Sequence, residues 1–474
     1  MMKTSKNRFP YFVAKLVPTF LILTTITASY NSAVATATEN IANDKSLVLP
    51  SNKVSLQQTK TQPIAEPLTK QLDKSPEAVN TEQMKQVAKH QNATIVQYSI
   101  IADESPVNGK REIQESELYI WVIKPTGDMQ FRRVDLKAWE KIEKNSFFNL
   151  FIRRTRPTLG ARSINLKGSG LKIKPEDKTL QFDLKKLHQV LIEPIADLLP
   201  QKPEERVIFI PQGELFTVPF AALQDANNKY LIEKHTISTS PSIQVLDLLY
   251  QRKKERKDEK PFVPKNITGD ELLIVGNPTA PKTPLTAGSD NCKASRLPGA
   301  EKEAKIIAEM FQTQPLIGDA ATETAIVQKM PQARIIHLAT YTFAENCQKE
   351  DSPGVIALAT SEGDDGWLRT GEIQNLNLKA DLVVLTGCDT ALGRITGDGI
   401  IGLSRAFLGA GADSVIGSLW DVDDISTAAL MTEFYGKLSE NTDKAGALRQ
   451  AMLETMKKYP NPSDWAGFTL VGLL

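Results

Sequence analysis

A cysteine and a group of carboxylates follow two apolar segments in the C-terminal part of the sequence. Cys388 comes shortly after the apolar run 382–385, which is typical of a central parallel strand covered on both faces. The next predicted strand, 414–419, leads directly into Asp421 and Asp423. Reacting groups and ligands collect beyond the carboxyl ends of parallel strands. The sequence therefore predicts a thiol facing carboxylates at one edge of a sheet.

Cys388 lies in the turn T-G-C-D and has the surroundings of a nucleophile. The backbone N–H groups of such a turn, around Gly387, can stabilise a developing oxyanion. The alternative is a buried cysteine without chemistry, since cysteine is among the most internalised residue types. Local sequence alone leaves both interpretations open.

A cysteine nucleophile needs a base at the tip of a neighbouring strand. The strand predicted from residue 334 contains His337 and reaches its tip at Tyr341. Because the intervening extended residues span roughly 13 Å, we expect His337 inside the sheet, as a core histidine with its hydrogen bonds satisfied. Neutral tyrosine, with a reference pKa of about 10, is a poor general base at about pH 7.

The acidic residues allow two interpretations. Asp421 and Asp423 can cap the following helix, or they can accept a basic side chain of a substrate; Asp389, directly after Cys388, joins them as a candidate substrate-binding residue. Carboxylates without nearby histidines do not favour a transition-metal site. We predict no metal and no cofactor.

A dinucleotide site is the competing pattern. Gly397, Gly399 and Gly402 match G-x-G-x-x-G, and Asp421 follows about twenty residues later. The fingerprint needs its first glycine immediately after a strand, so that the pyrophosphate meets the helix N-terminus. Here about ten residues separate Leu385 from Gly397. We therefore predict no nucleotide partner.

The elements around these residues predict an α/β fold in two halves. Strand and helix alternate along the second half, which is typical of a doubly wound, mostly parallel sheet. Apolar spacing predicts helices at 183–199 and 399–410. A charge run at 252–260 separates an N-terminal half, 93–262, from a C-terminal half, 263–474. Its mixed signs favour a solvated linker over a nucleic-acid patch.

Composition excludes some partners. The formal net charge is +1, so the protein as a whole has no strong positive electrostatic potential that would attract nucleic acid. Hydrophobic residues make up 41% and charged residues 24%, which is ordinary for a globular protein. Residues 38–92 are polar and predict a flexible tether that ends in a short helix near 81–90.

The N-terminal residues 1–37 are typical of a signal peptide. Basic residues precede an apolar stretch at 16–28, and A-x-A options follow near residues 33–37. We expect an exported protein, periplasmic or extracellular, with an uncleaved N-terminal anchor as the alternative and the only expected link to a membrane. Export implies an oxidising compartment, in which an odd cysteine is free or functional. Cys292 and Cys347 are a weak candidate pair.

Several longer stretches resemble a known family. They are ATIVQYSI, FIPQGELFTVPFAAL, LPGAEKEA, ARIIHLAT, LVVLTGCDTALG, GDGIIGLSRAFLGAGADSVIGSLWDVDD and LMTEFYGKL. Together they resemble the CHAT domain, a caspase-related family of bacterial proteins often attached to tetratricopeptide repeats. The resemblance covers about residues 93–474, and we find no such repeats in the sequence.

The resemblance implies a caspase-like α/β fold, a mostly parallel sheet flanked by helices, with a Cys–His dyad on adjacent strand tips. Its cysteine corresponds to Cys388. Its histidine, the second in an H-x-A-T-H-G-like motif, falls on Tyr341, and Thr342 follows where glycine is usual. Gly387 and Thr342 are the expected oxyanion residues. The sequence thus keeps the motifs and spacing of the family, while the dyad lacks its usual histidine base.

This departure implies a degenerate peptidase that binds a peptide or protein partner in a regulatory role. Loss of a positioned base typically lowers the rate by about 100- to 10,000-fold. The alternative is an active cysteine endopeptidase that prefers basic residues and uses Cys388 with a non-standard base, such as His337 after a local rearrangement.

Overall fold

The computed structural model describes residues 79–107, 110–137, 148, 152, 155–156, 159, 177–256, 260–281, 294, 296–343, 354–396, 399–440 and 443–474. Several predictions lie outside these residues: the signal peptide, most of the tether, and the Cys292–Cys347 pair. Among the helices that are described, none is long and apolar enough to cross a membrane.

The chain divides into two compact units. The first comprises Met1–Glu66 and Ile100–Ser116, and the second comprises Pro67–Ser99 and Glu117–Leu474. In the first unit, the described residues are the distal parts of two long strands, where the Ser116 hydroxyl donates to the Ile101 carbonyl at 3.2 Å. The second unit carries every candidate site residue, and the following paragraphs concern it.

The main sheet has 11 described strands in the order β3-β2-β1-β4-β5-β16-β15-β12-β8-β6-β7, and all of them belong to the second unit except for the parts of β1 and β2 within Ile100–Ser116. In chain order the strands are β1 (Ala93–Val107), β2 (Lys110–Ile123), β3 (Met129–Asp135), β4 (Arg206–Ile210), β5 (Thr236–Thr239), β6 (Leu272–Pro278), β7 (Leu316–Gly318), β8 (Ile335–Ala339), β12 (Leu382–Leu385), β15 (Ser414–Ser418) and β16 (Phe468–Gly472). Smaller sheets are formed by β9 (Thr342–Phe343), β10 (Val355–Ala357) and β11 (Trp367–Arg369), and by β13 (Gly393–Thr396) with β14 (Gly399–Gly402).

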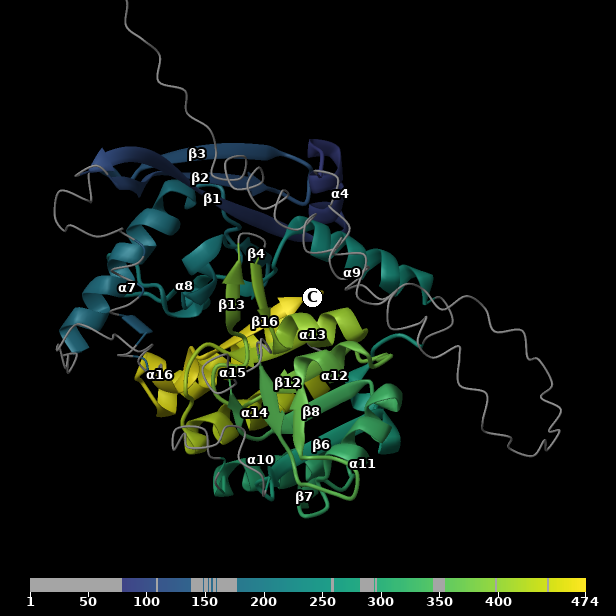
Figure 1. Ribbon diagram of the computed structural model, residues 1–474. Coiled ribbons are helices and arrows are strands. Elements are labelled where there is room, and N and C mark those ends of the chain that lie inside the picture. Colours follow the sequence, from purple (N-terminus) through teal and green to yellow (C-terminus); the bar gives the residue numbers. More distant parts are fainter. Residues whose placement is uncertain are drawn as a thin grey trace, which may run out of the picture. The chain divides into compact units, whose positions relative to one another are not determined.

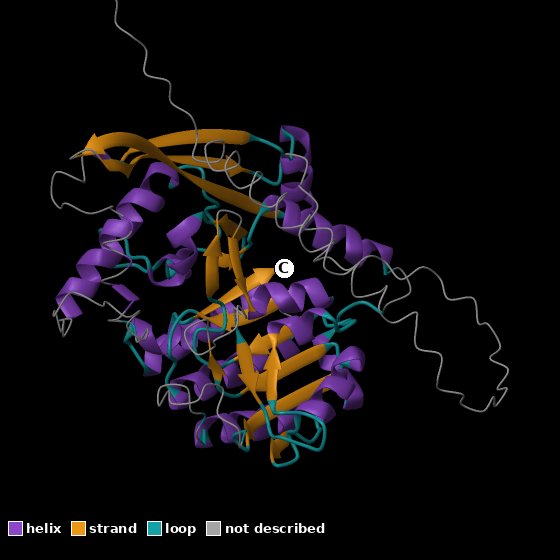
Figure 2. Cartoon of the chain, in the orientation of Figure 1, coloured by secondary structure: helices purple, strands orange, loops and turns teal. Residues whose placement is uncertain are grey.

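Strand direction divides the sheet into two parallel blocks. One block contains β1, β4, β5 and β16, and the other contains β15, β12, β8, β6 and β7. They meet where β15 pairs antiparallel with β16, from Ser414 opposite Gly472 to Ser418 opposite Phe468. The C-terminal strand thus completes the block that the N-terminal half begins. The prediction of a mostly parallel sheet flanked by helices is confirmed (Figure 2).

Helices cover both faces of the second block. The α-helices are α4 (Thr81–Gln91), α7 (Asp177–Leu191), α8 (Leu231–Lys234), α9 (Ile243–Glu255), α10 (Pro298–Met310), α11 (Glu323–Lys329), α12 (Thr370–Gln374), α13 (Leu403–Ala410), α14 (Asp424–Ser439), α15 (Lys444–Lys458) and α16 (Pro462–Trp465). The 3-10 helices are η1 (Glu193–Ile195), η2 (Gly213–Thr217), η3 (Phe220–Ala222), η4 (Pro264–Asn266), η5 (Gly269–Glu271) and η7 (Met330–Gln332). α10, α14 and α15 pack together on one face, while α9 and α11–α13 pack on the other (Figure 1).

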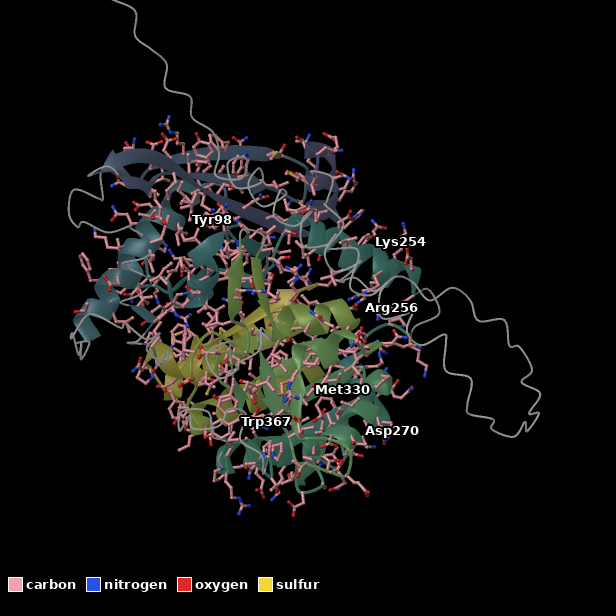
Figure 3. All side chains as sticks on the ribbon, in the orientation of Figure 1. Tyr98, Lys254, Arg256, Asp270, Met330 and Trp367 are labelled. Carbon is pink, nitrogen blue, oxygen red and sulfur yellow. The ribbon has the colours of Figure 1, made fainter. Side chains whose placement is uncertain are left out.

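Strand alternation divides the core between these two faces. Ile336 and Leu338 on β8 belong to the apolar cluster beneath α9 and α11–α13, and the intervening His337 faces α10 and α14, because successive side chains on a strand point to opposite faces. Met330 in the same cluster, and Arg256 at the end of α9, are labelled in Figure 3. The buried strands β8 and β12 are therefore held rigidly on both sides.

The helix predicted at 399–410 was wrong in its first turn. Residues 399–402 form β14, which pairs antiparallel with β13, and the helix α13 begins only at Leu403. A β-carbon on Gly402 would lie 2.3 Å from the Leu392 carbonyl oxygen, so only glycine permits this close strand pairing. β-Branched Ile400 and Ile401 also favour a strand. Their apolar spacing alone had indicated a helix.

The helix predicted at 183–199 is displaced toward the N-terminus. It spans Asp177–Leu191 and gives way to the 3-10 helix η1. Pro194 lies in η1 and lacks the N–H that a continued α-helix needs. The tether's short terminal helix is confirmed as α4, which is capped by Asn80.

Candidate functional site

The register of two parallel strands brings Tyr341 and Cys388 to the same level. On β8 and β12, Leu338 pairs with Leu385. Tyr341 and Cys388 each lie three residues beyond this pair, past the carboxyl ends of their strands. The Thr342 hydroxyl donates to the Cys388 carbonyl at 2.5 Å. The two strand tips are therefore in direct contact.

Cys388 lies in a tight, partly exposed turn. Among the described residues it forms no disulfide. Asp389 has a φ of 55°, in the left-handed region, and its N–H donates to the Trp420 carbonyl at 3.3 Å. A β-carbon on Gly387 would lie 2.4 Å from the Thr340 carbonyl oxygen, so glycine is required for this turn to approach the neighbouring chain.

Two buried hydroxyl side chains form hydrogen bonds that hold this turn in place. Thr390 donates to the Leu385 carbonyl at 3.0 Å, and Ser418 donates to the Gly387 carbonyl at 2.5 Å. The Ser418 N–H in turn donates to the Thr390 hydroxyl at 2.7 Å. Both side chains are fully buried. Sequence reasoning missed this pair, because serine and threonine carry no signal that distinguishes such a role.

His337 lies deep in the core. It pairs with Val384 on β12 and with Ile274 on β6, four positions before the level of Cys388. Its ring is fully buried, and Nδ1 is 3.1 Å from the Tyr435 hydroxyl. Nε2 lies 3.0 Å from Oε1 of Glu303, close enough for an ion pair although not aligned as a hydrogen bond. The core position expected from strand length is thus confirmed, but the expectation of satisfied hydrogen bonds holds for Nδ1 and not for Nε2.

Tyr341 packs beside the small three-stranded sheet. Its ring stacks on Phe343, with centroids 6.1 Å apart and planes inclined by 13°. It borders an apolar cluster that includes Val355 and Trp367. Its backbone carbonyl accepts a hydrogen bond from the Ala357 N–H at 2.9 Å. The strand tip is thus fixed by backbone pairing and ring packing together.

Thr342 uses its hydroxyl within the protein. Since that hydroxyl has one proton and donates it to the Cys388 carbonyl, an oxyanion would have to take the proton from this bond. The Gly387 carbonyl accepts a hydrogen bond from Ser418, which does not involve the Gly387 N–H that was predicted to stabilise an oxyanion. In this arrangement the Thr342 hydroxyl and the Gly387 carbonyl both hold the turn in place.

The three candidate acids have different surroundings. Asp423 caps α14, accepting from the N–H groups of Ile425 at 3.0 Å and Ser426 at 3.1 Å. Asp421 follows Trp420, whose carbonyl binds Asp389, so the structure brings Asp421 and Asp389 to neighbouring positions beside Cys388. Asp423 thus has the capping role that was the alternative interpretation for it.

Arg156 is a site residue that sequence reasoning missed. Its guanidinium lies 3.6 Å from Oδ1 of Asp389, and its side chain is only 9% exposed. Burial lowers the pKa of Arg156, while the negative charges of Asp389 and Glu214 raise it and offset part of this effect. The residue lies far from Cys388 in sequence and in no recognisable motif, so no local pattern indicated its position.

The glycines of the dinucleotide-like pattern lie in an antiparallel hairpin. Gly399 and Gly402 belong to the β13–β14 hairpin, Gly402 is also the N-cap of α13, and Gly397 lies outside the described residues. The dinucleotide fingerprint follows a strand of the main parallel sheet, whereas β14 pairs only with β13 in a separate two-stranded sheet.

A partly exposed cysteine turn thus lies past the ends of two parallel strands, with Asp389 directly beside it. Comparison with known proteins assigns the family. Residues 181–473 match the CHAT domain. Because this match covers more than half of the chain, the protein belongs to the CHAT domain family. The match begins later than residue 93, where the resemblance in the sequence was expected to start.

Curated relatives carry the same region within much longer chains. The chain is 29% identical to mouse Tetratricopeptide repeat protein 28 over 328 residues, covering 61% of this chain and 13% of that protein. The human protein of the same name is 28% identical over 379 residues, covering 70% of this chain and 15% of that protein. The chain therefore spans about one seventh of the length of these relatives.

Solved structures with a similar arrangement include two peptidases. The yeast (Saccharomyces cerevisiae) separase in its complex with securin, at 2.6 Å resolution, has a TM-score of 0.45 and 14% identity over 83% of this chain and 31% of that chain. The Arg-specific cysteine proteinase gingipain R, known from Porphyromonas gingivalis, has a TM-score of 0.36 and 13% identity over 71% of this chain and 76% of that chain. The family assignment above rests on the domain match.

Proposed function

We propose that this CHAT-domain protein is a degenerate caspase-like cysteine peptidase that binds a peptide or protein partner in a regulatory role. The observation that carries the proposal is the pairing of strand tips. Tyr341 and Cys388 each lie three residues beyond the paired residues Leu338 and Leu385, and the family resemblance expects the histidine base at the position of Tyr341. The ring of His337 is buried among Glu303 and Tyr435. Roughly 13 Å of strand separate its level from that of Cys388.

The rest of the site retains the features of a ligand-binding edge. The Cys388 turn is held by hydroxyls from β9 and β15, and its thiol remains partly exposed. Asp389 and Asp421 add negative charge beside it. A rigid, pre-organised turn with adjacent carboxylates can bind an extended peptide that carries a basic side chain. The protein loses little conformational entropy on binding, because the turn is already ordered. Peptide binding therefore survives the loss of the base.

The alternative is an active endopeptidase with Cys388 as nucleophile and a non-standard base. The ordered turn around Cys388 favours it. Hydrolysis also needs an acid that protonates the leaving amine, and in this alternative Tyr341 has to supply that proton. We expect activity far below that of an intact dyad, by about 100- to 10,000-fold.

The decisive experiment compares the full chain with Cys388→Ala and Tyr341→His. Fluorogenic peptides with arginine or lysine before the scissile bond report cleavage, and fluorescein-labelled peptides of the same sequences report binding by polarisation. We expect binding without cleavage in the parent, and a gain of cleavage in Tyr341→His. Cleavage by the parent that disappears in Cys388→Ala would establish the active peptidase instead.

We also propose export through residues 1–37, with association to a membrane only through an uncleaved N-terminus. The basic start and short apolar stretch support this proposal. Expression of the full chain, followed by N-terminal sequencing of the exported fraction, tests it. A mature N-terminus near residues 34–38 is the expected result, and an intact N-terminus in a soluble internal fraction would contradict it.

A further inference from the structure

The charge beside the candidate nucleophile already has a partner within the chain. Asp389 directly follows Cys388, and its carboxylate lies 3.6 Å from the guanidinium of Arg156. The Arg156 side chain is 9% exposed and that of Asp389 is 20% exposed. An arginine thus approaches the Cys388 turn from a part of the sequence more than two hundred residues away.

The hydrogen-bonding groups of the Arg156 guanidinium are only partly paired. Its Nη1 is buried and has no hydrogen-bond partner among the described residues. Its separation from Asp389 allows an ion pair but is longer than a direct hydrogen bond. A structural arginine normally forms bidentate, hydrogen-bonded pairs with its acid. A buried polar group left unpaired is costly and needs an explanation.

The charges around Arg156 form an acidic site for one basic group. Asp389 and Glu214, which lies on η2, both act on its guanidinium. The Asp389 backbone is fixed by its bond to Trp420 and by its left-handed conformation. The backbone that carries the Asp389 carboxylate is therefore held next to Cys388 by contacts that do not involve Arg156.

We propose that Arg156 is an internal competitor, filling beside Asp389 the position that an arginine or lysine side chain of a bound peptide would take. The inference rests on the proposed peptide-binding function and deepens it, because it names Asp389 as the residue that selects the basic side chain. The loose ion pair is consistent with displacement, since a ligand that binds more closely replaces it without breaking a direct hydrogen bond. Binding of a basic peptide then requires Arg156 to leave Asp389.

The first test measures peptide binding to the full chain and to Arg156→Gln. Two labelled peptides are compared by polarisation, one with arginine and one with glutamine at the same position. We expect Arg156→Gln to bind the arginine peptide about fivefold more tightly, as for removal of one short-range competing charge, and to leave the glutamine peptide unchanged. Arg132→Gln is the matched control, because Arg132 pairs with Asp197 at 3.1 Å on the edge strand β3.

The second test reads the local charge without any peptide. Modification of Cys388 is followed by mass spectrometry with a neutral, a trimethylammonium and a sulfonate methanethiosulfonate reagent. In Arg156→Gln the exposed carboxylate of Asp389 should raise the rate with the cationic reagent relative to the neutral one. In Asp389→Asn the unbalanced Arg156 should raise the rate with the anionic reagent. The second variant keeps the test decisive if the first does not fold.

The two tests separate the inference from the proposed function. Peptide binding that is equal in the parent and in Arg156→Gln overturns the inference and leaves the function standing. If neither the parent nor the variants bind peptide while both reagent preferences shift as expected, the proposed peptide-binding function is wrong. The shielding of the Asp389 charge by Arg156 is then still supported. Unchanged reagent preferences in both variants overturn the inference whatever the peptides do.

Discussion

The carbonyl of Cys388 is held by the hydroxyl of Thr342, from the segment that follows the neighbouring strand. We predict that Thr342→Val, which keeps the side-chain shape, lowers the free energy of unfolding by about 1 kcal/mol and changes the rate of Cys388 alkylation. Urea unfolding and mass spectrometry measure the two effects. Thr432→Val is the control, because its hydroxyl donates to a helix carbonyl on α14 at 2.7 Å. Equal alkylation rates in all three proteins would count against a role for Thr342 in placing the thiol.

The buried pair of His337 and Glu303 makes a second prediction at the scale of single residues. Both side chains are nearly inaccessible, at 0% and 2% exposure. Glu303→Ala removes one partner and leaves the other buried, so we expect a loss of about 3 to 5 kcal/mol in urea unfolding. The double variant His337→Leu/Glu303→Leu should be markedly more stable than Glu303→Ala. If Glu303→Ala unfolds like the parent, the pair has no structural role.

At the scale of elements, the short helix α8 ends at a buried histidine. Burial and, to a smaller extent, the nearby positive charges of Lys234 and Arg449 together lower the pKa of His235 from 6.5 to about 4. The His235 N–H donates to the Leu231 carbonyl, which closes the helix. His235 is therefore neutral in the folded protein over a range of pH in which the unfolded chain would bind a proton.

This difference predicts a pH dependence of stability. Between pH 6.5 and about 4 the unfolded state binds a proton at His235 that the folded state does not. The free energy of unfolding therefore falls as the pH is lowered through this window, by on the order of 2 to 3 kcal/mol from this residue. Urea unfolding of the parent and His235→Gln at a series of pH values isolates the contribution. The difference between the two proteins should change within the window and stay constant above it.

At the scale of the whole second unit, a buried charge network joins the two predicted halves. Lys253 near the end of α9 lies 2.9 Å from Asp413, and Arg256 pairs with the same carboxylate. Burial alone would raise the pKa of Asp413, but these two cations lower it below its usual value. On the second half, burial lowers the pKa of Lys444 to about 8, and its ammonium donates to Ser414 at 2.7 Å.

We predict that Asp413→Asn destabilises both halves together. The variant removes the charge of a carboxylate that is 1% exposed and leaves the partly buried Arg256 without this partner, which should cost about 3 kcal/mol. The exposed Lys253 keeps Asp381 nearby and contributes less. The unfolding transition should shift as one step, detected alike by tryptophan fluorescence and by far-ultraviolet circular dichroism. Separate transitions would instead indicate that the halves fold independently. Asp197→Asn is the control and should have little effect on the free energy of unfolding. Asp197 forms an exposed ion pair with Arg132 on the edge strand β3.

Much of the frame could be predicted from the sequence. The apolar run of β12 and the core position of His337 follow from strand periodicity and rise per residue, which are local properties of the chain. The placement of Tyr341 opposite Cys388 was expected from the resemblance to the CHAT family. The hairpin at β13–β14 was missed, because Ile400 and Ile401 fit a helical pattern equally well until the close approach of two glycines is seen.

The sequence by itself determined which strands are buried and where they end, because these features depend on short-range patterns that each segment carries alone. That Cys388 and Tyr341 follow neighbouring strands was expected from the resemblance to the CHAT family, and the structure pairs those strands, β8 and β12. Only the tertiary structure decided that Asp389 faces Arg156, that Asp423 serves α14 as its cap, and that Ser418 supports the turn of Cys388. Such contacts join residues far apart in sequence, and the packing of strands and helices fixes their partners.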